Sequence, residues 1–186
     1  MKKVLGYAML ALLATPLCLQ GQIRLGISGG AGNFTGDDFE GSKTGWTVGG
    51  ELVYPLASGL EIGGLFDYSS YGVDDVDTVD ANVMDIYGVA RYPFPGERAR
   101  FFVGAKGGYS RLSADSEGLS LSASGFAVGP TVGVRIPLSR ISIDIAGDGM
   151  YTSYGDAEFE GTTIEDSSSS GFRWIARAGI SIPLGS

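Results

Sequence analysis

The chain has 186 residues with a formal net charge of −8, no histidine and a single cysteine. The acidic balance argues against a nucleic-acid partner, because phosphate binding needs a basic surface. The lack of histidine removes the commonest general base and metal ligand and excludes Ser-His-Asp and Cys-His catalysis, so we expect no enzyme, no cofactor and no catalytic or metal site.

The first residues differ in character from the rest of the chain. Two lysines precede an uncharged apolar run over residues 4–19, which is typical of a secretory signal peptide. We expect residues 1–21 to be removed by cleavage near Gly21–Gln22, which leaves residues 22–186 as one domain. Two alternatives are less favoured. A transmembrane helix is disfavoured because the run is short and a proline interrupts it, and a lipoprotein is disfavoured because the residues before Cys18 do not suit lipidation.

Beyond this segment, apolar and polar residues alternate with a period of two, which is the period of a β-strand. The clearest example is Gly125–Leu138, where every second residue from Phe126 to Ile136 is apolar and the residues between them are small or polar. In chain order we expect strands over residues 22–32, 44–55 and 60–70, a strand ending at Tyr92, strands over 100–111 and 125–138, a strand beginning at Ile141, and a last strand over 171–184.

The predicted connections alternate in length. Polar, acidic segments cover residues 33–43, 71–82, 113–124 and 153–170, and tight turns at residues 57–59, 93–98 and 138–140 separate them. The tight turns would share one end of a barrel and the longer loops the other, as in outer-membrane barrels. Pro130 has no N–H group to donate to a neighbouring strand and predicts a bulge within the sixth strand.

No run of about 20 apolar residues follows the signal segment, so a membrane protein of this sequence must cross the bilayer as a closed barrel. The chain resembles the small eight-stranded outer-membrane barrels of the OmpA and OmpX type, in the broad group of outer membrane protein β-barrel domains and porin-like proteins. The resemblance covers residues 22–186 and rests on the strand architecture and on segments such as Gly129–Arg135, which ends a strand before a short turn.

The resemblance implies an all-β, eight-stranded antiparallel up-and-down transmembrane β-barrel with short periplasmic turns and longer extracellular loops. It places the protein in the bacterial outer membrane, in contact with lipid and lipopolysaccharide. Nothing in the sequence demands a partner chain, so we expect a monomer.

Strand parity predicts that twelve charged side chains point into the lumen. Six are basic and six are acidic, and an eight-stranded barrel is just wide enough inside for its own side chains, so we expect these charges to form a balanced network that fills the lumen. The predicted lumen charge network consists of Arg24, Glu51, Glu61, Asp67, Asp85, Arg91, Lys106, Arg135, Asp144, Asp148, Arg173 and Arg177.

The leading functional hypothesis is a non-enzymatic barrel that supports envelope integrity or meets an extracellular ligand or host surface, in the manner of an adhesin, through its acidic loops. The first alternative is a narrow porin-like channel for ions or small solutes along the polar lumen. The second is a soluble lipocalin-like barrel with an apolar interior, which the charge-free outer face disfavours. The acidic run over residues 74–77 lacks the EF-hand spacing, so divalent-cation bridging to lipopolysaccharide is a weaker expectation.

Overall fold

The computed structural model describes residues 22–36, 39, 41–73, 76–116, 119–159, 162–164 and 167–184. The predicted signal peptide over residues 1–21 lies outside them. Among these residues no helix is long and apolar enough to cross a membrane. The strands are β1 (Ile23–Thr35), β2 (Gly45–Pro55), β3 (Glu61–Val73), β4 (Val76–Pro93), β5 (Arg100–Ser116), β6 (Leu119–Leu138), β7 (Ile141–Tyr154), β8 (Ala157–Phe159), β9 (Thr162–Ile164) and β10 (Ser169–Leu184).

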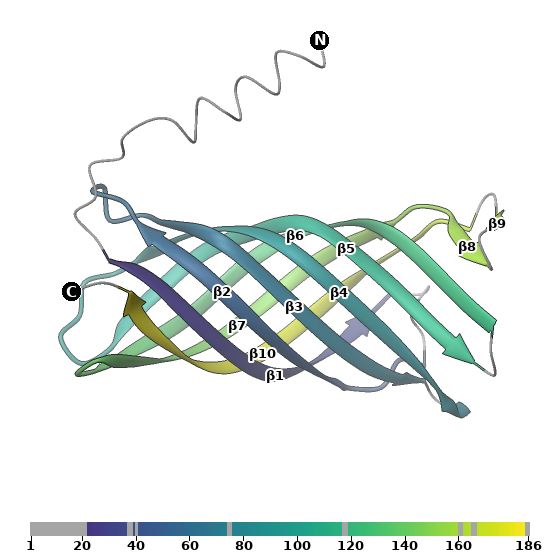
Figure 1. Ribbon diagram of the computed structural model, residues 1–186, viewed down its shortest axis with the longest axis horizontal. Helices are drawn as coiled ribbons and strands as arrows, with labels where there is room; N and C mark the ends of the chain where they lie inside the picture. Colours follow the sequence, from purple (N-terminus) through teal and green to yellow (C-terminus); the bar gives the residue numbers. More distant parts are fainter. Residues whose placement is uncertain are drawn as a thin grey trace, which may run out of the picture.

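Eight long strands close into an antiparallel barrel (Figure 1). Strands β1 to β7 pair in chain order, and β10 closes the ring between β7 and β1. The short β8–β9 hairpin attaches to β6 beyond the end of β7. The predicted eight-stranded up-and-down β-barrel is confirmed. We call the end that carries β8 and β9 the hairpin end, and the end where β1 begins and β10 finishes the turn end.

Burial alternates along every long strand, as a period of two requires. On β10, for example, Phe172 and Trp174 are exposed whereas Arg173 and Ile175 are buried. The exposed side chains of the central barrel are mainly large and apolar, and the buried ones include most of the charges. This is the arrangement of a barrel whose outer surface faces lipid.

Two of the predicted long loops are wrong. Residues 71–82 and 113–124 are largely strand, because β3 and β4 pair as far as Val73 and Val76, and β5 and β6 pair as far as Ser116 and Leu119. The predicted loop over residues 153–170 contains β8 and β9. The physical reason is a reversal of polarity, because near the hairpin end the inward side chains become mainly apolar. A prediction that assumes apolar side chains on the outward side therefore does not recognise these segments as strands.

The predicted bulge at Pro130 is also wrong. Val128 pairs with Tyr151 and Thr131 with Asp148, so each strand has two residues between these pairs and no residue is inserted. Pro130 pairs with Ala105 on the other side. The missing N–H group therefore interrupts the β6–β7 pairing without shifting its register.

Candidate functional site: the lumen charge network

All twelve predicted lumen charges lie on the inward side of their strands. Nine are buried and the other three, Arg24, Glu51 and Asp144, are partly buried. Their contacts divide them into three tiers along the barrel. The turn-end tier holds Arg24, Glu51, Glu61, Arg91, Arg135 and Asp144, the middle tier holds Asp67, Lys106, Asp148 and Arg177, and the hairpin-end tier holds Asp85 and Arg173.

Arg91 links two carboxylates of the turn-end tier. Its Nη2 lies 2.9 Å from Glu51 Oε1 and its Nη1 lies 3.1 Å from Glu51 Oε2, so the contact is bidentate. Its Nε lies 2.7 Å from Glu61 Oε2. The guanidinium also stacks over the Phe102 ring at 5.0 Å from the ring centroid. Two ion pairs and a ring contact therefore fix the orientation of this side chain.

The second carboxylate oxygen of Glu61 continues the network. It lies 2.7 Å from Arg135 Nη1, and Arg135 Nε lies 2.6 Å from Asp144 Oδ1. Ser181 Oγ donates to Asp144 Oδ2 at 2.6 Å and accepts a bond from Arg24 Nη2 at 3.1 Å. A continuous chain of polar contacts thus crosses the lumen near the turn end.

The middle tier centres on Arg177. Its two terminal nitrogens each lie 2.8 Å from an oxygen of Asp67, and Nη2 also lies 2.8 Å from Asp148 Oδ2. Lys106 Nζ lies 2.8 Å from the same Asp148 oxygen. The fork of the guanidinium matches the carboxylate of Asp67, which is the geometry that favours arginine over lysine.

The hairpin-end tier is a single, fully buried pair. Arg173 Nη2 lies 2.6 Å from Asp85 Oδ2 and donates to the Tyr87 hydroxyl at 2.6 Å. Its guanidinium lies 5.4 Å from the centroid of the Phe34 ring. Arg173 Nε and Nη1 find no protein partner among the described residues, and buried polar atoms of this kind are normally satisfied by ordered water.

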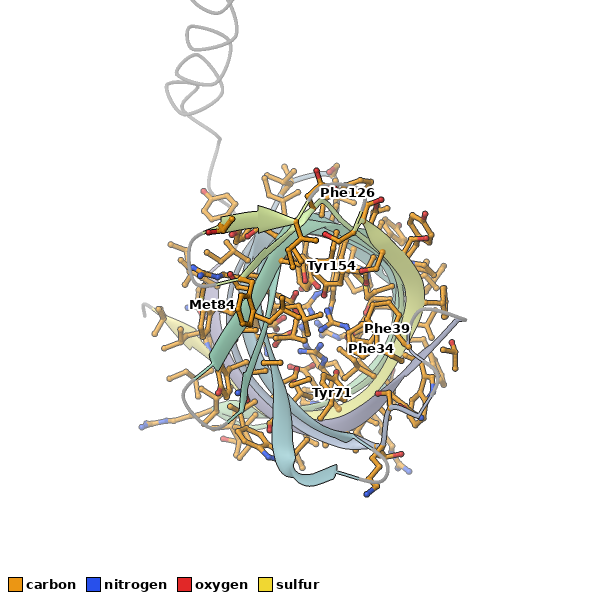
Figure 2. The ribbon with its side chains drawn as sticks, turned by 90° about the vertical axis from the view of Figure 1, so that its right-hand side faces the viewer. Phe34, Phe39, Tyr71, Met84, Phe126 and Tyr154 are labelled. Carbon is orange, nitrogen blue, oxygen red and sulfur yellow. The ribbon has the colours of Figure 1, made fainter. Side chains whose placement is uncertain are left out.

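An aromatic cluster covers this tier toward the hairpin end. Phe34 stacks on Phe39 with ring centroids 4.5 Å apart and meets Tyr71 edge-on at 5.0 Å. The ring centroid of Phe39 in turn lies 6.3 Å from that of Tyr154. Figure 2, which looks into the barrel from this end, shows Phe34, Phe39 and Tyr71 inside the ring of strands. The lumen is thus narrowed by rings above the Arg173–Asp85 pair.

Each tier contains as many acidic as basic side chains, three of each near the turn end, two of each in the middle and one of each near the hairpin end. Burial of a charge is costly unless an opposite charge compensates it, so local neutrality is what a narrow, poorly solvated lumen requires.

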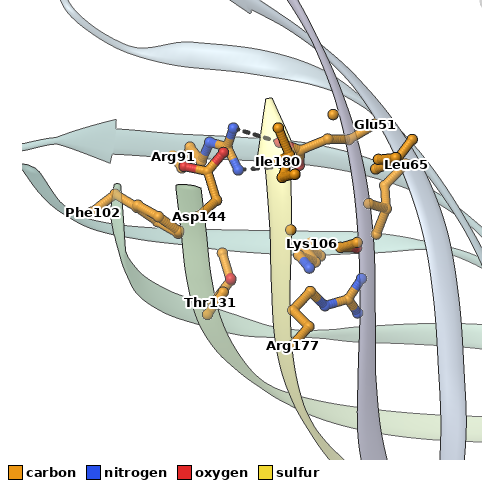
Figure 3. Close-up of a pocket in the computed structure, with 14 residues that line it drawn as sticks. Glu51, Leu65, Arg91, Phe102, Lys106, Thr131, Asp144, Arg177 and Ile180 are labelled. Atoms are coloured by element: carbon orange, nitrogen blue, oxygen red, sulfur yellow. Dashed lines mark hydrogen bonds and ion pairs between the residues drawn. The ribbon is translucent and has the colours of Figure 1, made fainter. Parts of the chain in front are cut away.

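The turn-end and middle tiers border a small cavity. It has a volume of about 30 Å³ and is lined by Arg91, Asp144, Lys106 and Arg177, among others (Figure 3). A volume of this size holds about one water molecule. Figure 3 also shows the paired contacts between Arg91 and Glu51 that border the cavity.

Sequence reasoning missed several aromatic members of the lumen. The predicted strands end too early, so Phe34, Tyr71 and Tyr154 fall in predicted loops, and the sequence pattern assigns no role to Phe102. Continuing the period of two past each predicted strand end would have found the first three, since all lie on the inward parity of their strands.

The fold is shared with several solved outer-membrane proteins. Neisserial surface protein A matches with a TM-score of 0.67 at 16% identity over 87% of this chain and 97% of that one. The attachment invasion locus protein Ail of Yersinia pestis, in complex with the heparin analogue sucrose octasulfate, matches with a TM-score of 0.55 at 15% identity over 87% and 99%. OprG of Pseudomonas aeruginosa matches with a TM-score of 0.50 at 12% identity over 89% and 98%.

No curated protein matches the chain by sequence. The family of the outer membrane protein beta-barrel domain, in contrast, matches residues 5–181 and therefore almost the whole chain. Together with the closed barrel and its apolar outer face, this match assigns the family: the chain belongs to the outer membrane protein beta-barrel domain family.

Proposed function

We propose that this protein is a non-enzymatic integral outer-membrane barrel that stabilises the envelope and presents its hairpin end to the medium as an interaction surface. The observation that carries the proposal is the filled lumen. Three neutral tiers of ion pairs span it, and the cavity that the turn-end and middle tiers border has a volume of only about 30 Å³. A structure of this kind supports the wall of the barrel rather than a path through it.

The proposed orientation places the turn end in the periplasm and the hairpin end outside, in contact with lipopolysaccharide. It follows the family pattern, in which both chain ends face the periplasm. A signal peptide over residues 1–21 with cleavage near Gly21–Gln22 would direct the chain there. We propose a monomer, because closure of the ring leaves none of the eight long strands with a free edge within the membrane-spanning part that the structure describes.

An adhesin-like role would require a partner different in charge from a sulfated sugar. The Ail structure holds a heparin analogue, which is a polyanion. Here the connections at the hairpin end are rich in carboxylates and carry one lysine, so a polyanion would be repelled.

Single-channel recording in a planar bilayer tests the proposal against the porin-like alternative. We expect the refolded barrel to show no discrete openings, because every charged tier closes the lumen with ion pairs. The Asp144→Ala variant removes one partner of the turn-end tier and serves as a lumen probe. Discrete openings of the native protein that change in this variant would contradict the proposal and make the lumen a conducting path.

A further inference from the structure

The barrel wall reverses its polarity near the hairpin end. In the central barrel the inward side chains include the twelve lumen charges, and the outward side chains are mainly apolar. Beyond the level of Tyr109 and Phe126, the inward positions of β5, β6, β8 and β9 are mainly apolar instead. The apolar inward side chains of this extension are Leu112, Ala114, Leu121, Ala123, Ala157, Phe159 and Ile164, whereas Ser110 and Thr162 are polar inward residues.

This inward surface is covered where it adjoins the central barrel and exposed farther toward the hairpin end. Leu112 packs against the buried cluster around Phe34. Leu121, Phe159 and Ile164, in contrast, are exposed by 41%, 38% and 44%. Leu121 and Phe159 face each other across β6 and β8, and Ile164 is opposite Ala157 on the adjoining strand. We call Leu121, Phe159 and Ile164 the inner apolar face.

The extension also ends in an open sheet edge. β9 is the last strand of the sheet order, paired only with β8 among the described strands. An edge strand offers unpaired backbone N–H and C=O groups to an extended chain, and side chains at alternate positions of that chain can then reach the inner apolar face.

The charge around this surface is predominantly negative. The four segments at the hairpin end, residues 33–43, 71–82, 113–124 and 153–170, carry three, four, two and five carboxylates, and Lys43 is the only basic residue within them. Their summed field attracts cations and repels anions. An apolar surface that is surrounded by acidic residues is complementary to a ligand that carries both apolar and basic groups.

We propose that the hairpin end binds extended cationic amphipathic peptides, with their apolar side chains on the inner apolar face and their backbone along β9. This inference rests on the proposed role of the hairpin end as an interaction surface and names the class of its partner. The acidic connections supply attraction and orientation, and the apolar contacts supply the specificity for an amphipathic chain over a merely basic one.

Fluorescence anisotropy tests the proposal with the full barrel in phosphatidylcholine nanodiscs. The probe is a labelled peptide of about ten residues that alternates lysine and valine, which matches the strand period. Peptides that alternate lysine with serine, or glutamate with valine, are the matched comparisons, and empty nanodiscs measure binding to lipid. We expect binding of the Lys-Val peptide alone, weakened when salt rises from about 50 to about 200 mM.

The variant Leu121→Ser/Phe159→Ser is expected to weaken the Lys-Val peptide at least about tenfold, because it removes two apolar contacts. Leu138→Ser changes an equally exposed leucine at the turn end and should leave binding unchanged. Heat-modifiable gel mobility confirms that each variant is folded.

Equal binding of the Glu-Val peptide, or no loss in the Leu121→Ser/Phe159→Ser variant, would overturn the inference. If the barrel shows no channel openings in bilayer recordings and does not bind the Lys-Val peptide, the inference is also overturned, but the proposed function stays intact. Discrete openings would count against the proposed function whether or not the peptide binds.

Discussion

At the scale of single residues, the most demanding contact is the buried pair of Arg173 and Asp85. Both side chains are fully buried, and the pair lies alone in its tier. The variant Arg173→Met keeps an unbranched apolar chain but leaves Asp85 as an uncompensated buried charge. We expect it to lower the free energy of unfolding by about 3–5 kcal/mol, measured by urea titration of the barrel in lipid vesicles.

Two further variants separate the loss of the pair from the loss of an arginine. The double variant Arg173→Met/Asp85→Asn removes both charges and is expected to be less destabilised than Arg173→Met. Arg100→Ala removes an exposed arginine near the turn end and should change the free energy of unfolding by no more than about 0.5 kcal/mol. If Arg173→Met lowered the free energy of unfolding no more than Arg100→Ala does, water and not Arg173 would be what compensates the charge of Asp85.

At the scale of strands, two glycines on neighbouring strands have opposite packing. A Cβ added to Gly129, on the inward side of β6, would collide with the carbonyl oxygen of Gly149 and lie 2.9 Å from Met150 Cα. A Cβ added to Gly147, on the outward side of β7, would meet nothing within 4 Å. The inward glycine therefore allows the close approach of β7 that a narrow barrel requires.

The matched variants Gly129→Ala and Gly147→Ala should accordingly differ. Both remove the same flexibility from the unfolded chain, but only the first forces backbone atoms apart. We expect Gly147→Ala to be neutral or stabilising by up to about 1 kcal/mol and Gly129→Ala to be clearly destabilising, by urea titration in vesicles. If the two variants unfolded at the same urea concentration, close strand approach would not be what selects glycine at residue 129.

The strands also show how far sequence reasoning reaches. The period of two in Gly125–Leu138 sufficed to predict the β6 strand, and the same parity placed the twelve charges inside. The strand parity does not predict which charges pair. Arg177 and Asp67 are separated by 110 residues in the sequence, and Arg173 and Asp85 by 88. Such contacts depend on the tilt and stagger of the closed sheet, which local alternation does not encode.

At the scale of the whole molecule, one continuous sheet meets two solvents. In its central part the apolar side chains point outward, as contact with lipid requires, and the lumen takes the charges. Nearer the hairpin end the apolar side chains point inward, as in a sheet surrounded by water. The change of side occurs just beyond Tyr109 and Phe126, which are exposed aromatic residues of the kind found at membrane interfaces.

An arginine scan along the outward side of β6 locates this boundary. Val132→Arg lies within the apolar belt and is expected to cost about 2–4 kcal/mol in free energy of unfolding, whereas Phe126→Arg at the aromatic level should cost less. Ser122→Arg, outward on the extension and paired in register with Glu158, should cost close to nothing because its charge stays in water. Urea titration in vesicles of one lipid composition measures all three. A cost at Ser122 equal to that at Val132 would place the extension inside the bilayer and remove the hairpin end from the surface on which the proposed interaction depends.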